Sequence, residues 1–287
     1  MPTLSVVVLT RNERHNLSAC LNSLGDLADE IIVLDGFSTD GTPELAASLG
    51  ARVVLEPRWE GWGRRRQLAQ QHCSCDYVMH LDADERLTPE LVAELREALS
   101  HAGPATVLAL PRLTELFGTP IRHCGWYPDY VYRVYPRCFT HYDDALVHEK
   151  LLLPAGTELI HLKNHLRHYS YPDIAGFLRK QSFYALCYGR DNKHHATHVS
   201  LALIPLRAMA AFGKSYFIKR GFLDGWAGLW LSLAQGAYVV YKYLALAALL
   251  KGCNPGTIPG EKPIADSSAK QITPAGSAPA PVTPPRE

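Results

Sequence analysis

Residues 29–50, DEIIVLDGFSTDGTPELAASLG, contain in order the parts of one strand–turn–helix unit. The apolar, β-branched run at residues 31–34 predicts a buried strand. A turn rich in Gly, Ser and Asp follows it, and Pro43 suits the first position of the next helix. Gly50 suits the position just after the end of that helix. The stretch therefore predicts a strand whose chain returns over the sheet as a helix.

The same unit recurs on both sides of this stretch. Further strands are expected at residues 4–10, 51–57 and 76–85, and further helices at residues 11–24, 63–73 and 88–101. Four alternations of strand and helix predict an α/β fold, with a mostly parallel sheet of right-handed βαβ units flanked by helices. Ligands bind beyond the carboxyl ends of such strands, so the polar residues that follow each apolar run form the candidate site.

The overall composition excludes some classes of protein. Lys and Arg number 29 and Asp and Glu number 28, so no global charge favours a nucleic-acid partner. The seven cysteines show neither a disulfide framework nor a complete zinc-binding spacing, which predicts reduced thiols in a cytosolic protein. Residues 1–13 lack the basic segment and the long apolar run of a signal peptide. We therefore expect a cytoplasmic protein.

The segment YVMHLDADERLTPEL, residues 77–91, carries four acidic side chains around the end of the fourth predicted strand. Thr88 and Pro89 predict a helix start, and acids near a helix start are the alternative explanation for this cluster. Asp82, however, lies too early to cap that helix. Asp82 and Asp84 are one residue apart and would point to the same side of an extended segment. Paired carboxylates of this kind favour a hard divalent cation.

Several segments resemble a known family. LSVVVLTRNE, DEIIVLDGFSTDGT and HLDADERLTPEL, in this order, are similar to the signatures of inverting family 2 glycosyltransferases with the GT-A fold. GWYPDYVYRVYPR, ALVHEKL and RGFLDGWAGL resemble a bacterial subgroup, the lipopolysaccharide inner-core β-1,4-glucosyltransferases. The resemblance implies a Rossmann-like GT-A domain, a nucleotide-sugar donor such as UDP-glucose, and Mg²⁺ or Mn²⁺ as the cofactor.

The resemblance also assigns roles to the polar residues at the strand ends. Asp84 would bind the metal directly, and Asp82 would share that metal site or contact the donor ribose. Asp35 would accept a hydrogen bond from uracil, in a chain that has DGF where the family usually has two adjacent Asp. In the family the loop with Thr10, Arg11 and Glu13 borders the nucleotide, so these residues are expected to contact the nucleotide sugar. From their residue type, Arg65 is a candidate phosphate ligand of the donor, and Arg133 and Arg137 are candidate partners for the phosphates of either substrate.

An inverting transfer needs a general base that takes the proton of the acceptor hydroxyl. The candidates lie in HYDDALVHEKL, residues 141–151. The resemblance favours Glu149 as the base, with Asp144 in reserve. His148 would orient the base or contact the diphosphate. The alternative to a catalytic role is that each acid simply lies on the surface and that the histidine is packed in the interior.

The carboxyl-terminal part is expected to be helical and basic. Residues 225–241, GWAGLWLSLAQGAYVVY, run 17 positions without a charge. This is less than the roughly 20 apolar residues that a membrane-spanning helix needs. Aromatic rings along this segment suit a position at the lipid headgroups. Amphipathic helices on the membrane surface are therefore favoured over a span or over packing in a core.

We expect three parts in the chain. The first is a glycosyltransferase domain at residues 1–165, with a nucleotide-binding half at 1–100 and an acceptor-binding half at 101–165. The second is a helical membrane-associating region at residues 166–252. The third is a disordered tail at residues 253–287, which is rich in Pro and Ala and cannot build a core.

The leading functional hypothesis is a metal-assisted inverting transfer of glucose from UDP-glucose onto a heptose of the lipopolysaccharide inner core. The enzyme would lie peripherally on the inner face of the cytoplasmic membrane. Polyprenyl phosphate or an exopolysaccharide intermediate is the alternative acceptor. A catalytically silent nucleotide-sugar-binding scaffold is a third possibility, against which the intact Asp82 and Asp84 argue. No nucleic-acid partner is expected, because no wider basic stripe accompanies Arg64–Arg66.

Overall fold

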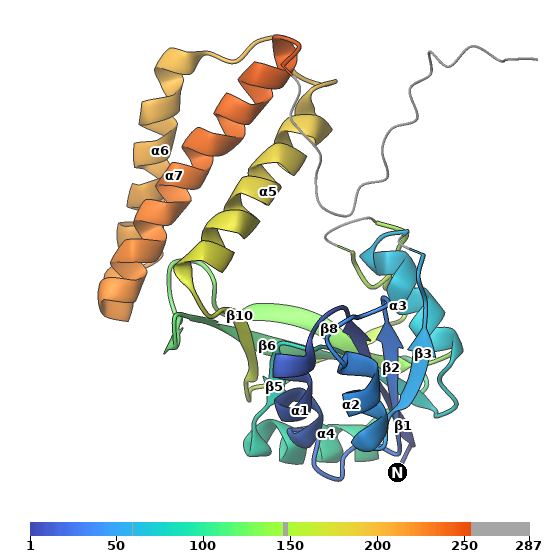
Figure 1. Ribbon diagram of the computed structural model, residues 1–287. Helices are drawn as coiled ribbons and strands as arrows, with labels where there is room; N and C mark the ends of the chain where they lie inside the picture. The colour runs from blue at the N-terminus through green and yellow to red at the C-terminus, as the bar shows by residue number, and fades with distance from the viewer. Residues whose placement is uncertain (59, 146–148, 254–287) are drawn as a thin grey trace, which may run out of the picture. The chain divides into compact units, whose positions relative to one another are not determined.

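The computed structural model describes residues 1–58, 60–145 and 149–253, and its sheet is flanked by helices (Figure 1). The ten strands of the sheet are β1 (Leu4–Thr10), β2 (Glu30–Asp35), β3 (Arg52–Leu55), β4 (Tyr77–Asp82), β5 (Glu85–Leu87), β6 (Thr106–Leu116), β7 (Thr119–Pro120), β8 (Asp129–Pro136), β9 (Glu158–His161) and β10 (Leu166–Tyr171). The α-helices are α1 (Arg14–Asn22), α2 (Thr42–Ser48), α3 (Trp62–Gln71), α4 (Pro89–His101), α5 (Ile174–Asn192), α6 (Ile204–Gly213) and α7 (Gly225–Leu250). The α/β fold expected from the sequence is confirmed.

The amino-terminal half of the sheet is parallel. Strands β3, β2, β1 and β4 lie side by side in this order, and every pairing among them is parallel. Strand β8 then runs antiparallel to both β4 and β6, whereas β10 runs parallel to β6 and antiparallel to β5. The carboxyl-terminal half is therefore mixed, because β6 turns back through β7 before β8 takes the place beside β4.

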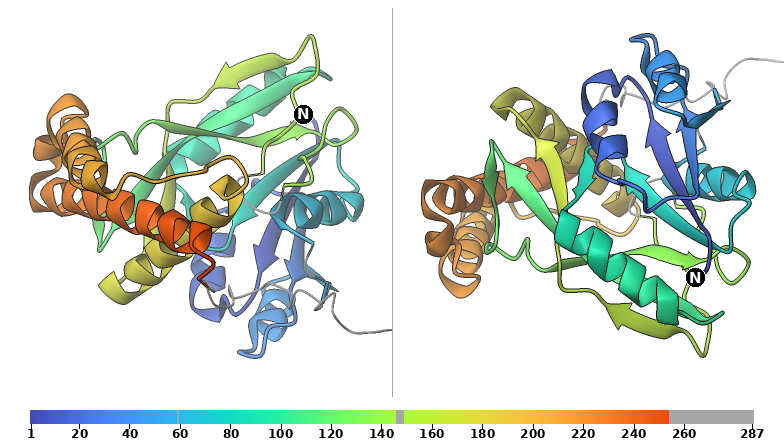
Figure 2. Two further views of the ribbon diagram at one scale, coloured as in Figure 1. Left: turned by 90° about the horizontal axis from the view of Figure 1, so that it is seen from above. Right: turned by 90° about the horizontal axis from the view of Figure 1, so that it is seen from below.

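Both faces of the sheet are buried, as the continuous apolar runs require. On β1, Leu4, Val6 and Val8 belong to one core together with the leucines of α1 and α4. The alternate residues Val7 and Leu9 belong to a second core on the α3 side. Figure 2 shows α4, in teal, lying across one face of the sheet in the view from below. The parallel strands are thus covered on both faces by apolar side chains.

The start of α4 follows the signal in the sequence. The backbone N–H of Leu91 donates to Oγ1 of Thr88 at 3.2 Å, and Pro89 occupies the first helical position. A capping hydroxyl satisfies one of the backbone donors that every helix leaves unpaired at its start. Strand β4 ends at Asp82, and residues 83–84 form a turn into β5. The expectation that Asp82 and Asp84 share one extended segment was therefore wrong.

Strand β10 extends the sheet beyond residue 165. Leu166 pairs with both Arg112 of β6 and Leu87 of β5. The predicted boundary between residues 165 and 166 falls just before this strand, so the sheet extends into the part of the chain that the sequence predicts to be helical. The division of the chain into three parts otherwise stays a prediction, and its tail at residues 254–287 lies outside the described residues.

Helices α5, α6 and α7 lie side by side (Figure 1). Glycines allow the close approaches: a Cβ on Gly189 of α5 would lie 2.9 Å from Leu249, and one on Gly236 of α7 would lie 3.2 Å from the carbonyl of Ala208. The carboxyl-terminal ends of α5 and α7 therefore lie together, and α6 runs antiparallel to α7. A third apolar cluster, which includes Leu116, Phe177 and Leu231, packs the amino-terminal parts of α5 and α7 against the β6–β7 hairpin.

Two segments in the described part of the chain are long and apolar enough to cross a membrane. They are Leu201–Ile218 and Gly221–Leu250, with mean hydropathies of 1.3 and 1.4. Only 11% and 17% of these segments are buried in the protein, so they are not ordinary core helices.

Candidate active site

The strand register brings the predicted residues to one edge of the sheet. Thr10 at the end of β1 pairs with Asp35 at the end of β2, and Leu9 pairs with Asp82 at the end of β4. These three carboxyl ends are neighbours, which is where parallel α/β sheets bind ligands. The prediction that Thr10, Asp35 and Asp82 lie at one edge is thereby confirmed, while their individual roles stay predictions.

Asp35 is fully buried and organises the first turn of the edge. Its carboxylate accepts hydrogen bonds from the hydroxyl of Thr10 at 2.7 Å, from the hydroxyl of Ser38 at 2.6 Å and from the N–H of Ser38 at 2.7 Å. An ionised carboxylate offers about four acceptor positions, so one remains for a further donor. Ser38 also accepts a hydrogen bond from the N–H of Asn12 at 2.7 Å. Asp35 therefore fixes the turn after β2 against the end of β1.

Arg65 and Arg11 lie beside this turn, next to Gly36. Arg65 is buried, and its Nη1 donates to the carbonyl oxygens of Glu56 at 3.1 Å and Arg58 at 3.4 Å. Burial lowers the pKa of Arg65, partly offset by Glu56 and Asp35. Arg11 is exposed at the end of β1. Both arginines therefore lie near the edge at which the predicted nucleotide would bind.

Asp82 is clamped between two buried arginines. Nη2 of Arg66 donates to Oδ1 at 2.8 Å, and Nη2 of Arg133 donates to Oδ2 at 2.5 Å. Burial raises the pKa of Asp82, but the two guanidinium groups outweigh it and hold the pKa well below its ordinary value. The side chain is nevertheless 29% exposed. Asp82 is thus a fixed carboxylate with both oxygens already paired.

The clamp belongs to a longer chain of alternating charges. Nε of Arg66 donates to Oε1 of Glu149 at 2.8 Å, so one guanidinium joins Asp82 to the predicted base. Nη2 of Arg133 also donates at 3.0 Å to Oε1 of the fully buried Glu85. Charge-assisted hydrogen bonds of this kind hold side chains in fixed positions. Glu85, which the sequence left between two explanations, is a structural member of this network.

Asp84 faces a different partner. Nε2 of His168, on β10, lies 3.4 Å from Oδ2 of Asp84, and Nδ1 of His168 lies 3.2 Å from the hydroxyl of Thr114. Burial raises the pKa of Asp84, but His168 outweighs it, so the pKa is lowered. One carboxylate and one imidazole thus converge at the turn that follows β4. Among the described residues, no three or more His, Cys, Asp and Glu side chains are arranged so that they could hold a metal ion.

Glu13 lies close enough to Asp84 for the two charges to interact. Burial raises the pKa of Glu13, and the nearby Asp84 raises it further, against a hydrogen bond of 2.9 Å from Asn16. Lys180 of α5 lowers the pKa of both acids, while its Nζ donates to the hydroxyl of Ser170 at 2.7 Å. The first turn after β1 and the start of α5 therefore both border the Asp84 turn.

Asp144 lies away from this carboxylate network. It is exposed, and its Oδ1 accepts a hydrogen bond from Nε2 of Gln67 at 2.8 Å. The loop that carries it approaches the start of α3 closely, because a Cβ on Gly63 would lie 1.9 Å from the carbonyl of Asp143. The structure joins Glu149, and not Asp144, to the buried network. His148 lies outside the described residues.

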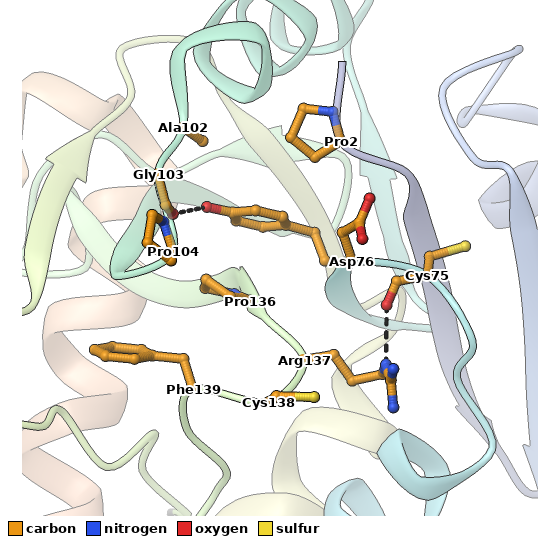
Figure 3. A pocket seen from close by; sticks show the side chains of 11 residues that line it. Pro2, Cys75, Asp76, Ala102, Gly103, Pro104, Pro136, Arg137, Cys138 and Phe139 are labelled. Carbon is orange, nitrogen blue, oxygen red and sulfur yellow. Dashed lines mark hydrogen bonds between the residues drawn. The ribbon is translucent and has the colours of Figure 1, made fainter.

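Arg137 is not brought to the site. Its Nε donates to the carbonyl of Cys75 at 2.9 Å, beside the amino-terminal end of β4. Strand β8 runs antiparallel to β4, so Arg133 and Arg137 are carried to opposite ends of that strand. Arg137 instead lines a hollow of about 580 Å³ together with Asp76 and Phe139 (Figure 3). This hollow opens at the amino-terminal strand ends and lacks the acidic turn.

Two residues of the site were missed from the sequence. Arg66 was one of three adjacent arginines, and periodicity alone did not select it. His168 lies 84 positions after Asp84 in an unremarkable stretch of β10, and no local pattern marks it. Tertiary pairing alone places both of them beside the acids.

Comparison with known proteins agrees with this architecture. The model of the family described as "Glycosyl transferase family 2" matches residues 5–180. An uncharacterized glycosyltransferase of Rickettsia bellii is 28% identical over 266 residues, which cover 88% of this chain and 89% of the relative. The lipopolysaccharide core biosynthesis glycosyltransferase LpsC of Rhizobium meliloti is 37% identical over 120 residues, 40% of this chain and 44% of that protein.

A solved structure also shows local similarity. Glucosyl-3-phosphoglycerate synthase from Mycobacterium tuberculosis, in complex with Mn²⁺ and UDP-glucose, is 28% identical over 40% of this chain and 44% of that chain, with a TM-score of 0.34. A TM-score at this level does not indicate a shared overall structure. The family match spans more than half of the chain, however, and the chain belongs to glycosyl transferase family 2. The protein is therefore a glycosyltransferase.

Proposed function

We propose that this glycosyltransferase catalyses an inverting, metal-assisted transfer of glucose from UDP-glucose to a lipid-linked glycan, with a heptose of the lipopolysaccharide inner core as the acceptor. The observation that carries the proposal is the convergence at one sheet edge of a fixed carboxylate (Asp82), a carboxylate–imidazole pair (Asp84 and His168) and a second fixed carboxylate (Glu149). The partial likeness to LpsC supports the choice of acceptor.

The metal fits Asp84 and His168 better than Asp82. Both oxygens of Asp82 are already paired with arginines, whereas Asp84 and His168 offer an oxygen and a nitrogen at the same point. Mg²⁺ and related ions are commonly held by one or two side chains and by the phosphates of the substrate, with water completing the shell. When bound, the ion would neutralise the charge that develops on the leaving diphosphate. This geometry speaks against Asp82 as a metal ligand and leaves it to the donor ribose.

Glu149 is proposed as the general base. Arg66 holds one of its oxygens at 2.8 Å, which fixes the direction of the carboxylate, and a carboxylate has a second oxygen that accepts the acceptor proton. The acceptor oxygen then forms a bond to the anomeric carbon as the bond to the diphosphate breaks on the opposite side. The proton goes to Glu149 and the electron pair to the diphosphate, which accounts for inversion in a single displacement.

The reaction is tested with the purified full chain, UDP-[¹⁴C]glucose, Mn²⁺ or Mg²⁺, and lipopolysaccharide truncated at the inner core. Asp84→Ala should abolish metal-dependent transfer and weaken Mn²⁺ binding in the presence of UDP, as measured by electron paramagnetic resonance. Glu90→Ala, an acid at the start of α4, is the matched control and should change neither. Full activity and unchanged Mn²⁺ binding in Asp84→Ala would refute the proposed metal site.

The assignment of the base is tested separately. Glu149→Gln should lower kcat by about 10²- to 10⁴-fold while UDP binding changes little, because a positioned base contributes in this range. Asp144→Asn is the control, and it should keep most of the activity. If Asp144→Asn instead loses turnover and Glu149→Gln does not, the base is Asp144.

The alternative acceptors are separated by the same assay. If glucose is transferred to polyprenyl phosphate or to an exopolysaccharide intermediate, and not to truncated lipopolysaccharide, the proposed acceptor is wrong and the proposed reaction type stands. Tight UDP binding without any transfer or hydrolysis would favour a scaffold. The enzyme is proposed to act at the inner face of the cytoplasmic membrane, where its apolar carboxyl-terminal helices suit a lipid-linked acceptor.

A further inference from the structure

The turn between α6 and α7 combines large exposed apolar side chains with a local excess of basic residues. It comprises η2 (Lys214–Ile218), η3 (Gly221–Asp224) and the start of α7, and we call residues 214–226 the α6–α7 corner. Its exposed apolar side chains are Phe217 (63%), Ile218 (74%), Phe222 (48%), Leu223 (56%) and Trp226 (60%). Side chains of this size rarely gather on the surface of a protein unless another body covers them.

The exposed charges of the corner are all positive. Lys214, Lys219 and Arg220 are exposed beside the apolar side chains. The corner's acid, Asp224, is turned inward: its carboxylate accepts hydrogen bonds from the N–H of His123 at 2.8 Å and from the N–H of Arg122 at 3.3 Å. The exposed charge of the corner is therefore positive, which complements an anionic surface.

The corner is fastened to the catalytic domain. Besides the bonds to Asp224, the N–H of Cys124 donates to the carbonyl of Lys219 at 3.0 Å. A Cβ on Gly221 would lie 2.7 Å from Sγ of Cys124, so the backbone at Gly221 packs directly against the Cys124 side chain. The loop at residues 121–126 leads into β8, which carries Arg133 to the Asp82 clamp. Whatever covers the corner is thereby held at a fixed place relative to the catalytic edge.

This attachment disfavours a membrane span by α6 and α7. Helix α6 arrives at the corner and α7 leaves it, so both would have to cross the bilayer away from the catalytic domain. Helix α5, which connects the sheet to the far end of α6, would then have to cross as well. It carries Arg179, Lys180, Arg190 and Asp191, and charges are costly in the apolar layer. A position along the membrane surface avoids this.

We propose that the α6–α7 corner docks on the surface of an anionic lipid bilayer, with its apolar side chains among the acyl chains and its basic side chains at the lipid phosphates. The exposed stripe of α7 that continues from Trp226 through Leu229 and Leu233 extends this contact along the membrane plane. The inference rests on the proposed membrane location, and it is independent of the proposed reaction.

Vesicle binding by the full-length protein tests the proposal. Sedimentation with phosphatidylcholine vesicles that contain phosphatidylglycerol should show binding, and pure phosphatidylcholine should bind far more weakly. Removing the three bases, by Lys214→Gln, Lys219→Gln and Arg220→Asn, should weaken binding to the anionic vesicles about 100-fold, since each base near such a surface contributes about five-fold. Asn is chosen for Arg220 because this residue has a φ of 55°, which Asn tolerates.

The controls separate docking from misfolding and from self-association. Arg96→Gln with Lys163→Gln, a half-buried and an exposed base near α4, should leave vesicle binding unchanged. Phe217→Ser with Ile218→Ser should abolish it, while metal-dependent UDP-glucose hydrolysis in solution stays at the wild-type level. A wild-type protein that shows neither hydrolysis nor transfer to truncated lipopolysaccharide refutes the proposed reaction and leaves the vesicle result standing.

Three outcomes would overturn the inference. Equal binding to neutral and anionic vesicles would remove the role of the bases. Unchanged binding in both sets of corner variants would place the contact elsewhere. A change in sedimentation coefficient of the corner variants without vesicles would show that a second copy of the chain covers the corner.

Discussion

Replacing Arg66 by Met tests whether the buried charge network fixes the site. Arg66 is 4% exposed and donates to Asp82 and to Glu149, each at 2.8 Å. Methionine keeps the aliphatic stem and removes both hydrogen bonds. Breaking a buried ion pair on one side costs about 3–5 kcal/mol, because a charge is left without its partner. Asp82 keeps Arg133 and is 29% exposed, so water recovers part of this cost.

We therefore expect the Arg66→Met variant to lose about 2–4 kcal/mol in the free energy of unfolding. This is the range for a broken buried ion pair, lowered because Asp82 is partly exposed to water. For a domain of this size the loss corresponds to a fall in Tm of about 5–15 °C. The measurement is urea and thermal unfolding of the wild type and variant, followed by circular dichroism in the same non-ionic detergent.

Arg64→Met is the matched control on the same helix. Arg64 is 42% exposed and lies 3.8 Å from Glu60, which is itself 52% exposed. A surface pair of this kind contributes about 0–1 kcal/mol. If Arg66→Met loses no more stability than Arg64→Met, the network does not hold the site together and its hydrogen bonds are incidental.

Two further predictions concern the loss of stability at low pH and the close contact between Gly63 and the loop that carries Glu149. Because the folded pKa of Asp82 is depressed, its contribution is present above the unfolded value of about 3.9 and is lost as the pH falls through the folded pKa. Stability titrated from pH 7 downwards should fall in this window, and an Asp82→Asn variant that follows the same curve would contradict the assignment. Gly63→Ala should displace the loop that carries Glu149 and lower kcat, because its Cβ would lie 1.9 Å from a carbonyl oxygen. Gly213→Ala, a helical glycine with open space around it, should leave kcat unchanged; equal losses would mean that the contact is unimportant.

The amino-terminal half of the fold was predictable because its signals are local. Each apolar run of four to seven residues is long enough for one buried strand, and Thr88 with Pro89 marks the start of α4 within one residue. Parallel strands end at a common edge, so the order of strands and helices was enough to expect Thr10, Asp35 and Asp82 together. The same reasoning did not predict where Arg137 lies, because the direction of β8 depends on a strand pairing that no local pattern reveals.

Sequence alone thus determined the class of fold, the sheet edge that carries the candidate site, and the family, since periodicity, caps and signature segments act over short distances. Only the tertiary structure decided how the charged groups are shared along that edge. Arg133 reaches Asp82 across 51 positions, and His168 reaches Asp84 from β10. A carboxylate's partners depend on which distant strands pair beside it, and this pairing decides whether an acid is clamped, as Asp82 is, or joined to an imidazole, as Asp84 is.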